Sequence, residues 1–125
     1  MIEYHIDIRA QIVHCRVSGM VNPLALSNYF ERLTHDPDFH PRLDTLVDIS
    51  DASALKNAAH RKLLAGLLHM WSEYRSGSKW AMVWPDPSSS TLAEEIARKQ
   101  GFQAIALRCF TDRAEALAWL RPGSP

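Results

Sequence analysis

The chain has 125 residues and a formal net charge of zero at pH 7, because 14 lysine and arginine residues balance 14 aspartate and glutamate residues. This length is typical of one domain, which buries enough surface to fold without a disulfide or a structural metal. The sequence contains no basic block, which argues against nucleic acid as a partner, and no apolar run near the ~20 residues that a membrane-spanning helix needs.

The first two elements are predicted to be strands because apolar and polar side chains alternate in them. In residues 1–8, apolar residues at the even positions alternate with Glu3, His5 and Asp7, and residues 11–18 alternate again. Alternation with one polar face is typical of a half-buried strand at the edge of a sheet. The short link between the two segments predicts an antiparallel hairpin.

A helix and a buried strand are predicted next. Asn22 is a typical N-cap and Pro23 a typical first helical residue, so the helix should begin there and end before Pro37. Residues 43–49 are mostly apolar, with Asp48 near their end. This pattern is typical of a central parallel strand whose polar tip lies at the carboxyl edge of the sheet.

A long helix is predicted from about Asn57, and a strand that is buried on both faces is predicted at 80–84. The residues expected on the inward face of the helix are Leu63, Leu64, Leu67, Leu68 and Trp71. Residues 85–90 favour a loop, since they are rich in proline and serine.

The last predicted elements are two helices and a strand. Thr91 and Glu94 fit a capping box that opens a third helix, a strand follows at 104–110, and Asp112 caps a final helix. The order predicts an α/β fold with a mostly parallel five-stranded sheet, opened by an antiparallel hairpin, and four helices. We expect residues 1–121 to form a single domain and residues 122–125 to be a loose tail.

Five segments spread along the chain share a family resemblance. They are Val17-Ser18-Gly19, Asp36-Pro37-Asp38-Phe39 at the end of a helix that carries Tyr29, the strand at 46–50, the segment 80–83 and the closing block 110–120. Together they resemble the SpoIIAA-like group of STAS-type domains (sulfate transporter and anti-sigma-factor antagonist). The resemblance covers the whole chain and implies the same α/β fold. Relatives act as phosphorylatable protein-interaction modules or resemble lipid-binding CRAL-TRIO domains.

The chain departs from that family where the family is regulated. The anti-sigma-factor antagonists carry Asp-Ser-Ser/Thr-Gly at the entry to the helix after the central strand, and its Ser or Thr is phosphorylated. Here residues 51–60 read D-A-S-A-L-K-N-A-A-H. We therefore expect neither Ser50 nor Ser53 to be phosphorylated efficiently by a kinase of that type.

Polar residues gather after the central strand. Asp48, Ser50, Asp51 and Ser53 form a candidate ligand or partner loop at the carboxyl edge of the sheet. The same residue types are typical of a solvated loop that caps the next helix, and this second interpretation is favoured because they are common at such positions.

The sequence predicts no cofactor, no metal and no catalytic site. The residue types of His35, Asp36, Asp38 and His40 suit a metal, but prolines make their segment irregular and no second ligand cluster accompanies it. No phosphate-loop, dinucleotide or Gly-x-Ser-x-Gly motif occurs. Cys15 and Cys109 are predicted to be buried free thiols, and without a signal-peptide pattern we expect a cytoplasmic protein.

The long helix carries a wider apolar arc than a helix on one sheet face needs. With Trp84 from the following strand, its residues Leu67, Met70, Trp71 and Tyr74 form an apolar pocket, a dimer surface or an ordinary tryptophan-rich core. We predict a non-catalytic interaction or regulatory module that binds a protein partner or itself as a homodimer. The alternative is a carrier or sensor of a small apolar or lipid-like ligand, which a cavity lined by Leu67, Met70, Trp71 and Trp84 would favour.

Overall fold

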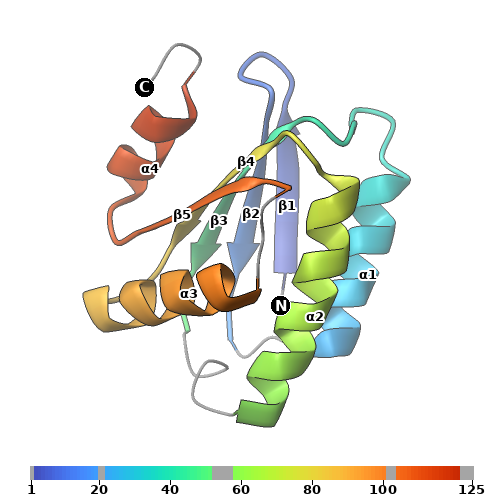
Figure 1. Ribbon diagram of the computed structural model, residues 1–125. Helices are drawn as coiled ribbons and strands as arrows, with labels where there is room; N and C mark the ends of the chain where they lie inside the picture. The colour runs from blue at the N-terminus through green and yellow to red at the C-terminus, as the bar shows by residue number, and fades with distance from the viewer. Residues whose placement is uncertain (1, 20–21, 52–57, 101–103, 122–125) are drawn as a thin grey trace.

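The computed structural model describes residues 2–19, 22–51, 58–100 and 104–121 as a layered α/β structure (Figure 1). The strands are β1 (Ile2–Asp7), β2 (Ile12–Val17), β3 (Asp44–Ile49), β4 (Lys79–Val83) and β5 (Ala106–Phe110), and the helices are α1 (Pro23–Thr34), α2 (Ala58–Tyr74), α3 (Pro87–Gln100) and α4 (Arg113–Leu120). The predicted α/β fold is confirmed. Among the described residues, no helix is long and apolar enough to cross a membrane.

The described strands follow one another across the sheet in the order β1-β2-β3-β4-β5. β1 pairs antiparallel with β2, and the other neighbouring strands pair in parallel. Because each parallel crossover is right-handed and advances in the same direction, α1, α2 and α3 lie on one face of the sheet. Figure 1 shows α4 apart from these three helices.

Two hydrophobic cores fill the layers on the two sides of the sheet. The larger core includes Val13, Cys15 and Val17 of β2 and lies beneath α1, α2 and α3. The smaller core lies beneath α4, which covers β3, β4 and β5. On the same side of the sheet, Ile12 of β2 belongs to the smaller core, and the rest of this face of β1 and β2 carries exposed or half-buried polar residues. We call this polar part the open face. Its polar residues are Glu3, His5, Asp7, His14 and Arg16.

β3 is the central strand of the sheet, as the sequence predicts. It has a parallel neighbour on each side, and Asp48 is its second-last residue. The described parallel strands never reverse their order, so the sheet lacks the switch point at which open α/β sheets form a binding crevice. A site in this fold must therefore be built elsewhere than in such a crevice.

Local capping places α1 and α4 where the sequence predicts them. The Asn22 side chain accepts a hydrogen bond from the Ala25 amide at 2.8 Å, and Pro23 opens the first turn of α1. The Asp112 side chain accepts from the Ala114 amide at 2.9 Å and caps α4. These bonds satisfy amides that a helix leaves without partners at its start.

The predicted start of α3 is wrong. The helix begins at Pro87, inside the segment for which the sequence favours a loop. Asp86 accepts a hydrogen bond from the Ser89 amide at 2.7 Å, and Pro87 suits the first helical position because no amide is needed there. Glu94 makes no capping box with Thr91. Instead its carboxylate accepts a hydrogen bond from the Cys109 amide at 3.0 Å, which joins α3 to β5.

The predicted inward face of α2 is wrong at Leu63, which is 60 % exposed. Ala65 and Trp71 are buried, and Leu68 packs against the larger core. Residues 63 and 65 differ by about 200° around a helix, so they cannot share a face. The predicted start at Asn57 and the side chain of Leu64 lie outside the described part of the chain.

A fully buried arginine joins the end of α2 to the segment before β3. Arg75 has no exposed surface. Its Nε donates to the Pro41 carbonyl at 2.7 Å, and its Nη2 donates to the Leu43 carbonyl and, at 2.9 Å, to the Thr45 hydroxyl. These bonds satisfy backbone carbonyl groups of the segment that leads into β3.

Aromatic rings surround the same guanidinium group. Its central carbon lies 5.1 Å, 5.9 Å and 5.8 Å from the ring centres of Phe39, Trp71 and Trp80. Burial lowers the pKa of Arg75 to about 10, so the group remains charged at neutral pH. Ring faces attract a cation, and this attraction offsets part of the free energy of removing it from water.

We expect Arg75→Ala to lower the free energy of unfolding by about 3–5 kcal/mol, because it leaves buried carbonyl groups unpaired and opens a cavity. Urea denaturation measures the change. The matched control is Arg42→Ala, an exposed arginine next to the same segment, which should change stability by less than about 0.5 kcal/mol. Equal stability of the two variants would contradict the structural role of Arg75.

Candidate functional site

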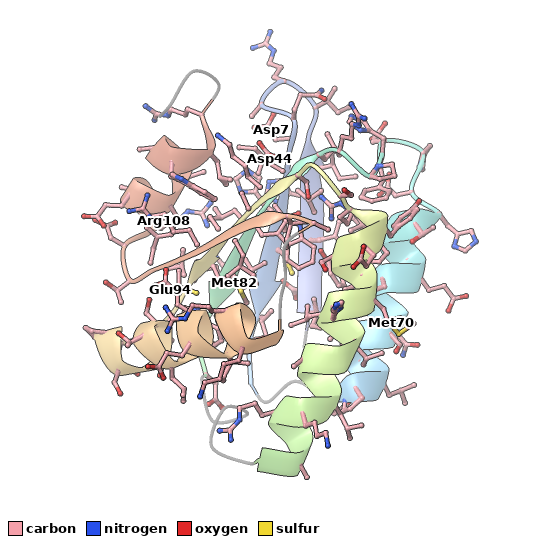
Figure 2. The ribbon with its side chains drawn as sticks, viewed as in Figure 1. Asp7, Asp44, Met70, Met82, Glu94 and Arg108 are labelled. Atoms are coloured by element: carbon pink, nitrogen blue, oxygen red, sulfur yellow. The ribbon has the colours of Figure 1, made fainter. Side chains whose placement is uncertain are left out.

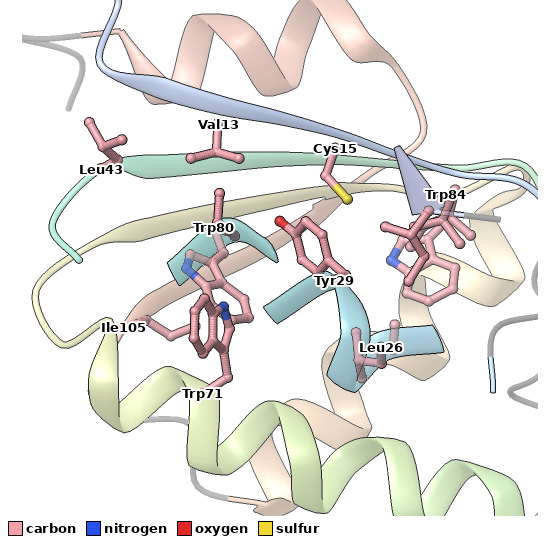
Figure 3. Packing of buried hydrophobic residues seen from close by; sticks show 14 residues of the cluster. Val13, Cys15, Leu26, Tyr29, Leu43, Trp71, Trp80, Trp84 and Ile105 are labelled. Carbon is pink, nitrogen blue, oxygen red and sulfur yellow. The ribbon is translucent and has the colours of Figure 1, made fainter. Parts of the chain in front are cut away.

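A cavity of about 160 Å³ lies between the sheet and the layer of α1, α2 and α3. All five strands or their ends line it, and so do the three helices. Figure 2 shows Met82, one of the lining residues, at the centre of the molecule, and Figure 3 shows part of the aromatic wall.

Small side chains on two facing helices leave this space open. Ala65 of α2 and Ala93 and Ala97 of α3 line the cavity, where larger residues would fill it. Unfilled space in a core lowers stability, because the side chains around it lose packing contacts.

The lining is almost entirely carbon, and its two central polar groups are bound to each other. The Tyr29 hydroxyl donates a hydrogen bond to the Cys15 sulfur, and Figure 3 shows these two atoms facing one another. Burial raises the pKa of Cys15 to about 12 and raises the pKa of Tyr29 well above its usual value. Both groups therefore remain protonated at neutral pH, and neither acts as a nucleophile or a base.

Two charged residues belong to the lining, and both reach solvent. Asp51, after β3, is exposed, and Arg61, on the first turns of α2, is half-buried. The cavity therefore opens to the surface beside these two side chains, while its inner part is apolar.

The apolar residues singled out from the sequence divide into two groups. Trp71 and Trp84 line the cavity, and Leu67 packs against the larger core without lining the cavity. Met70 is 73 % exposed on the surface of α2 (Figure 2), and Tyr74 is 48 % exposed. One predicted set thus corresponds to a cavity wall and a separate surface ridge.

The described polar residues at the end of β3 have different surroundings. The Asp48 carboxylate faces the α4 side of the sheet, where it lies 3.6 Å from Arg113 Nη1. Ser50 donates to the Val17 carbonyl at 3.2 Å, and Asp51 lines the cavity on the opposite face. Ser53 lies outside the described residues. A shared ligand loop of these residues stays a prediction.

The segment whose residue types suit a metal uses its polar groups in other contacts. Asp36 accepts a hydrogen bond from the Tyr4 hydroxyl at 2.8 Å, His35 Nδ1 lies 2.8 Å from the Glu31 carbonyl, and His40 Nε2 lies 3.2 Å from Gln11 Oε1. Among the described residues, no three histidine, cysteine, aspartate or glutamate side chains are grouped to hold a metal ion.

The sequence interpretation missed several residues of the cavity wall, above all Tyr29, Trp80 and Met82. Tyr29 lies in the apolar stripe of α1, and Trp80 and Met82 alternate along β4, so their burial follows from the sequence pattern. Their grouping around a space does not, because it depends on how far α2 and α3 stand from the sheet.

Comparison with protein families, with curated proteins and with solved structures finds no match to this chain. The resemblance to STAS-type domains therefore stays a prediction that rests on the sequence segments alone.

Histidines of the open face form a second polar cluster. The rings of His5 and His14 stack with their centres 4.7 Å apart, and Arg113 Nη2 lies 3.3 Å from His14 Nδ1. Arginine only donates, so His14 Nδ1 must be unprotonated to accept this bond. Burial, His5 and Arg113 lower the pKa of His14, and Asp7 partly opposes them.

The lowered pKa of His14 predicts a loss of stability in acid. The folded state favours the neutral imidazole of His14. The contribution of His14 to the free energy of unfolding is therefore complete above pH ~6.5, the pKa of histidine in an unfolded chain, and it is lost as the pH falls through the lower pKa of the folded protein. An NMR titration should give His14 a midpoint below 6.5, and His14→Gln should flatten the acid side of the stability profile. His40→Gln is the control, and a His14 midpoint above 6.5 would contradict the prediction.

Proposed function

We propose that the protein binds a small apolar molecule, without covalent chemistry, in the cavity between the sheet and α1, α2 and α3. The observation that carries the proposal is a cavity of about 160 Å³ with an apolar wall that includes Trp71 and Trp84. Apolar cavities of this size stay free of water and bind molecules as small as benzene. The protein would then be a carrier or sensor, which is compatible with a regulatory module of the STAS type.

The volume of the cavity limits the ligand. A cavity of about 160 Å³ accommodates a compact molecule of roughly one aromatic ring, by comparison with cavities of about 150 Å³ that bind benzene. A long acyl chain exceeds this volume, so the proposal favours a small apolar ligand over a lipid-like one.

Binding without catalysis is supported by the chemistry of the lining. The Cys15 thiol and Tyr29 hydroxyl are protonated and bound to each other, and the charged Asp51 and Arg61 belong to the solvent-exposed end. A cytoplasmic location is compatible with the two cysteines, which are both free thiols.

Tryptophan fluorescence provides a direct test with toluene as the probe. Three of the four tryptophans, Trp71, Trp80 and Trp84, line the cavity, so toluene binding should change the emission in a saturable way. Native mass spectrometry of protein taken directly from cells should then reveal a resident molecule of comparable size.

A cavity-filling variant makes the test specific. Ala93→Leu should abolish the toluene response and leave the free energy of unfolding unchanged or raised by about 0.5–2 kcal/mol, because the leucine occupies the space. The matched control is Ala114→Leu on the exposed side of α4, which should bind toluene normally. Unchanged binding in Ala93→Leu would show that toluene binds elsewhere and would exclude this function.

Self-association through α2 is a second candidate, because exposed apolar side chains form a ridge on that helix. Leu63, Met70 and Tyr74 are 60 %, 73 % and 48 % exposed. Their spacing of seven and four residues places them along one side of the helix. A ridge on one helix can meet its copy across a two-fold axis, which would give the homodimer predicted from the sequence.

We expect the double variant Met70→Lys, Tyr74→Lys to be a folded monomer if the ridge is a dimer surface, since four added charges at the contact would repel. Light scattering measures the mass, and circular dichroism confirms the fold. Glu73→Lys with Lys62→Glu, both exposed on the same helix, is a control that leaves the ridge intact. An unmodified protein that is monomeric at high concentration excludes this candidate.

A further inference from the structure

One end of the cavity is rich in hydrogen-bond donors. The Trp80 indole nitrogen is buried and finds no acceptor among the described residues, and Trp80 itself is only 4 % exposed. A buried donor without a partner lowers stability by about 1–3 kcal/mol. Trp80 is also one of the residues that line the cavity.

The neighbouring polar groups also donate. Thr45 lines the cavity, and its hydroxyl oxygen accepts a hydrogen bond from Arg75 Nη2 at 2.9 Å. A hydroxyl that accepts from arginine has its own proton available to donate elsewhere. Arg75 Nη1 is a further buried donor without an acceptor among the described residues.

A positive charge stands behind this end of the cavity. The Arg75 guanidinium contacts Thr45, Trp71 and Trp80, which all line the cavity, and no described carboxylate forms an ion pair with it. The carbonyl groups nearest to it, those of Pro41 and Leu43, already accept its hydrogen bonds. The Asp44 carboxylate acts on the guanidinium without forming an ion pair with it, whereas the guanidinium itself contacts Thr45 and Trp80. The field beside these two residues therefore favours the negative end of a dipole.

The opposite part of the wall differs. The Trp84 indole nitrogen is also buried without a hydrogen-bond partner among the described residues, and it lies near the weakly accepting Cys109 thiol. The Tyr29 hydroxyl is bound to Cys15. What distinguishes the Trp80 end is that further donors, the Thr45 hydroxyl and the Arg75 guanidinium, lie beside the unpartnered indole, whereas Trp84 has only a thiol near it.

We infer that the ligand is a small apolar molecule with one neutral hydrogen-bond acceptor, such as a carbonyl oxygen, which lies against Trp80 and Thr45. This inference rests on the proposed function and specifies the chemistry of its ligand. The apolar body lies along Met82 and Ala93, and the acceptor satisfies the Trp80 indole in the field of Arg75.

Two probes of similar shape test this inference. Toluene is purely apolar, whereas benzonitrile carries one neutral acceptor on the same ring. NMR chemical-shift titration gives Kd for each probe with the unmodified protein, with Trp80→Phe and with the control Trp119→Phe, whose ring packs against Phe110 near α4. Removing water from the nitrile costs the same free energy with the unmodified protein and with both variants. This cost therefore cancels when the ratio of the benzonitrile Kd to the toluene Kd is compared among the three proteins.

We expect the ratio of the benzonitrile Kd to the toluene Kd to rise about 2- to 12-fold in Trp80→Phe, which corresponds to the net value of one hydrogen bond. The ratio should stay unchanged in Trp119→Phe. In the unmodified protein, benzonitrile should shift the indole N–H resonance of Trp80 downfield, and this measurement needs no variant.

The outcomes separate the inference from the function on which it rests. If toluene binds but the ratio and the Trp80 resonance do not respond, the acceptor is not recognised and the inference is overturned, while the apolar site remains. If neither probe binds in a way that Ala93→Leu blocks, the proposed function itself fails.

Discussion

The buried guanidinium group of Arg75 is the interaction on which the arrangement of the larger core depends. Its hydrogen bonds to Pro41, Leu43 and Thr45 fix the end of α2 against the start of β3. Its contacts with the rings of Phe39, Trp71 and Trp80 hold those aromatic residues around one point, the guanidinium group. An isolated buried cation is unfavourable, so the group is tolerated because fixed carbonyl dipoles and ring faces surround it. The same aromatic residues form one end of the cavity, and this links the stability of the fold to the candidate site.

The cavity follows from the order of the strands. Since the strands advance in one direction, three helices must share one face of a five-stranded sheet, and α1 packs against α2 while α3 lies against β5. Ala65 of α2 and Ala93 and Ala97 of α3 then line the space that remains. A core filled to ordinary density would be more stable. The ligand that we propose would occupy this space and contribute the missing contacts.

Local signals account for the elements that the sequence placed well. The Asn22 and Asp112 caps each act within three residues, and the alternation in β1 and β2 reflects side chains that leave an extended strand on opposite sides. The same kind of signal explains the early start of α3, because Asp86 and Pro87 together form a stronger helix start than Thr91 and Glu94. The apolar character of Trp71 and Trp84 also indicated part of the site, although not whether they would line a cavity or a surface.

The sequence by itself determined the class of the fold, the order of its elements, the central position of β3 and the apolar nature of the layer beside α2. Only the tertiary structure decided which arc of α2 is buried, since leucine occurs on several sides of that helix and Leu63 is exposed while Leu68 is not. It also decided that Arg75 is buried, although an arginine just after a helix is ordinarily solvated, and that the Trp80 indole finds no acceptor in the described part of the chain. These features depend on the distances between helices and sheet, which are set by the packing of all side chains together and by no local pattern.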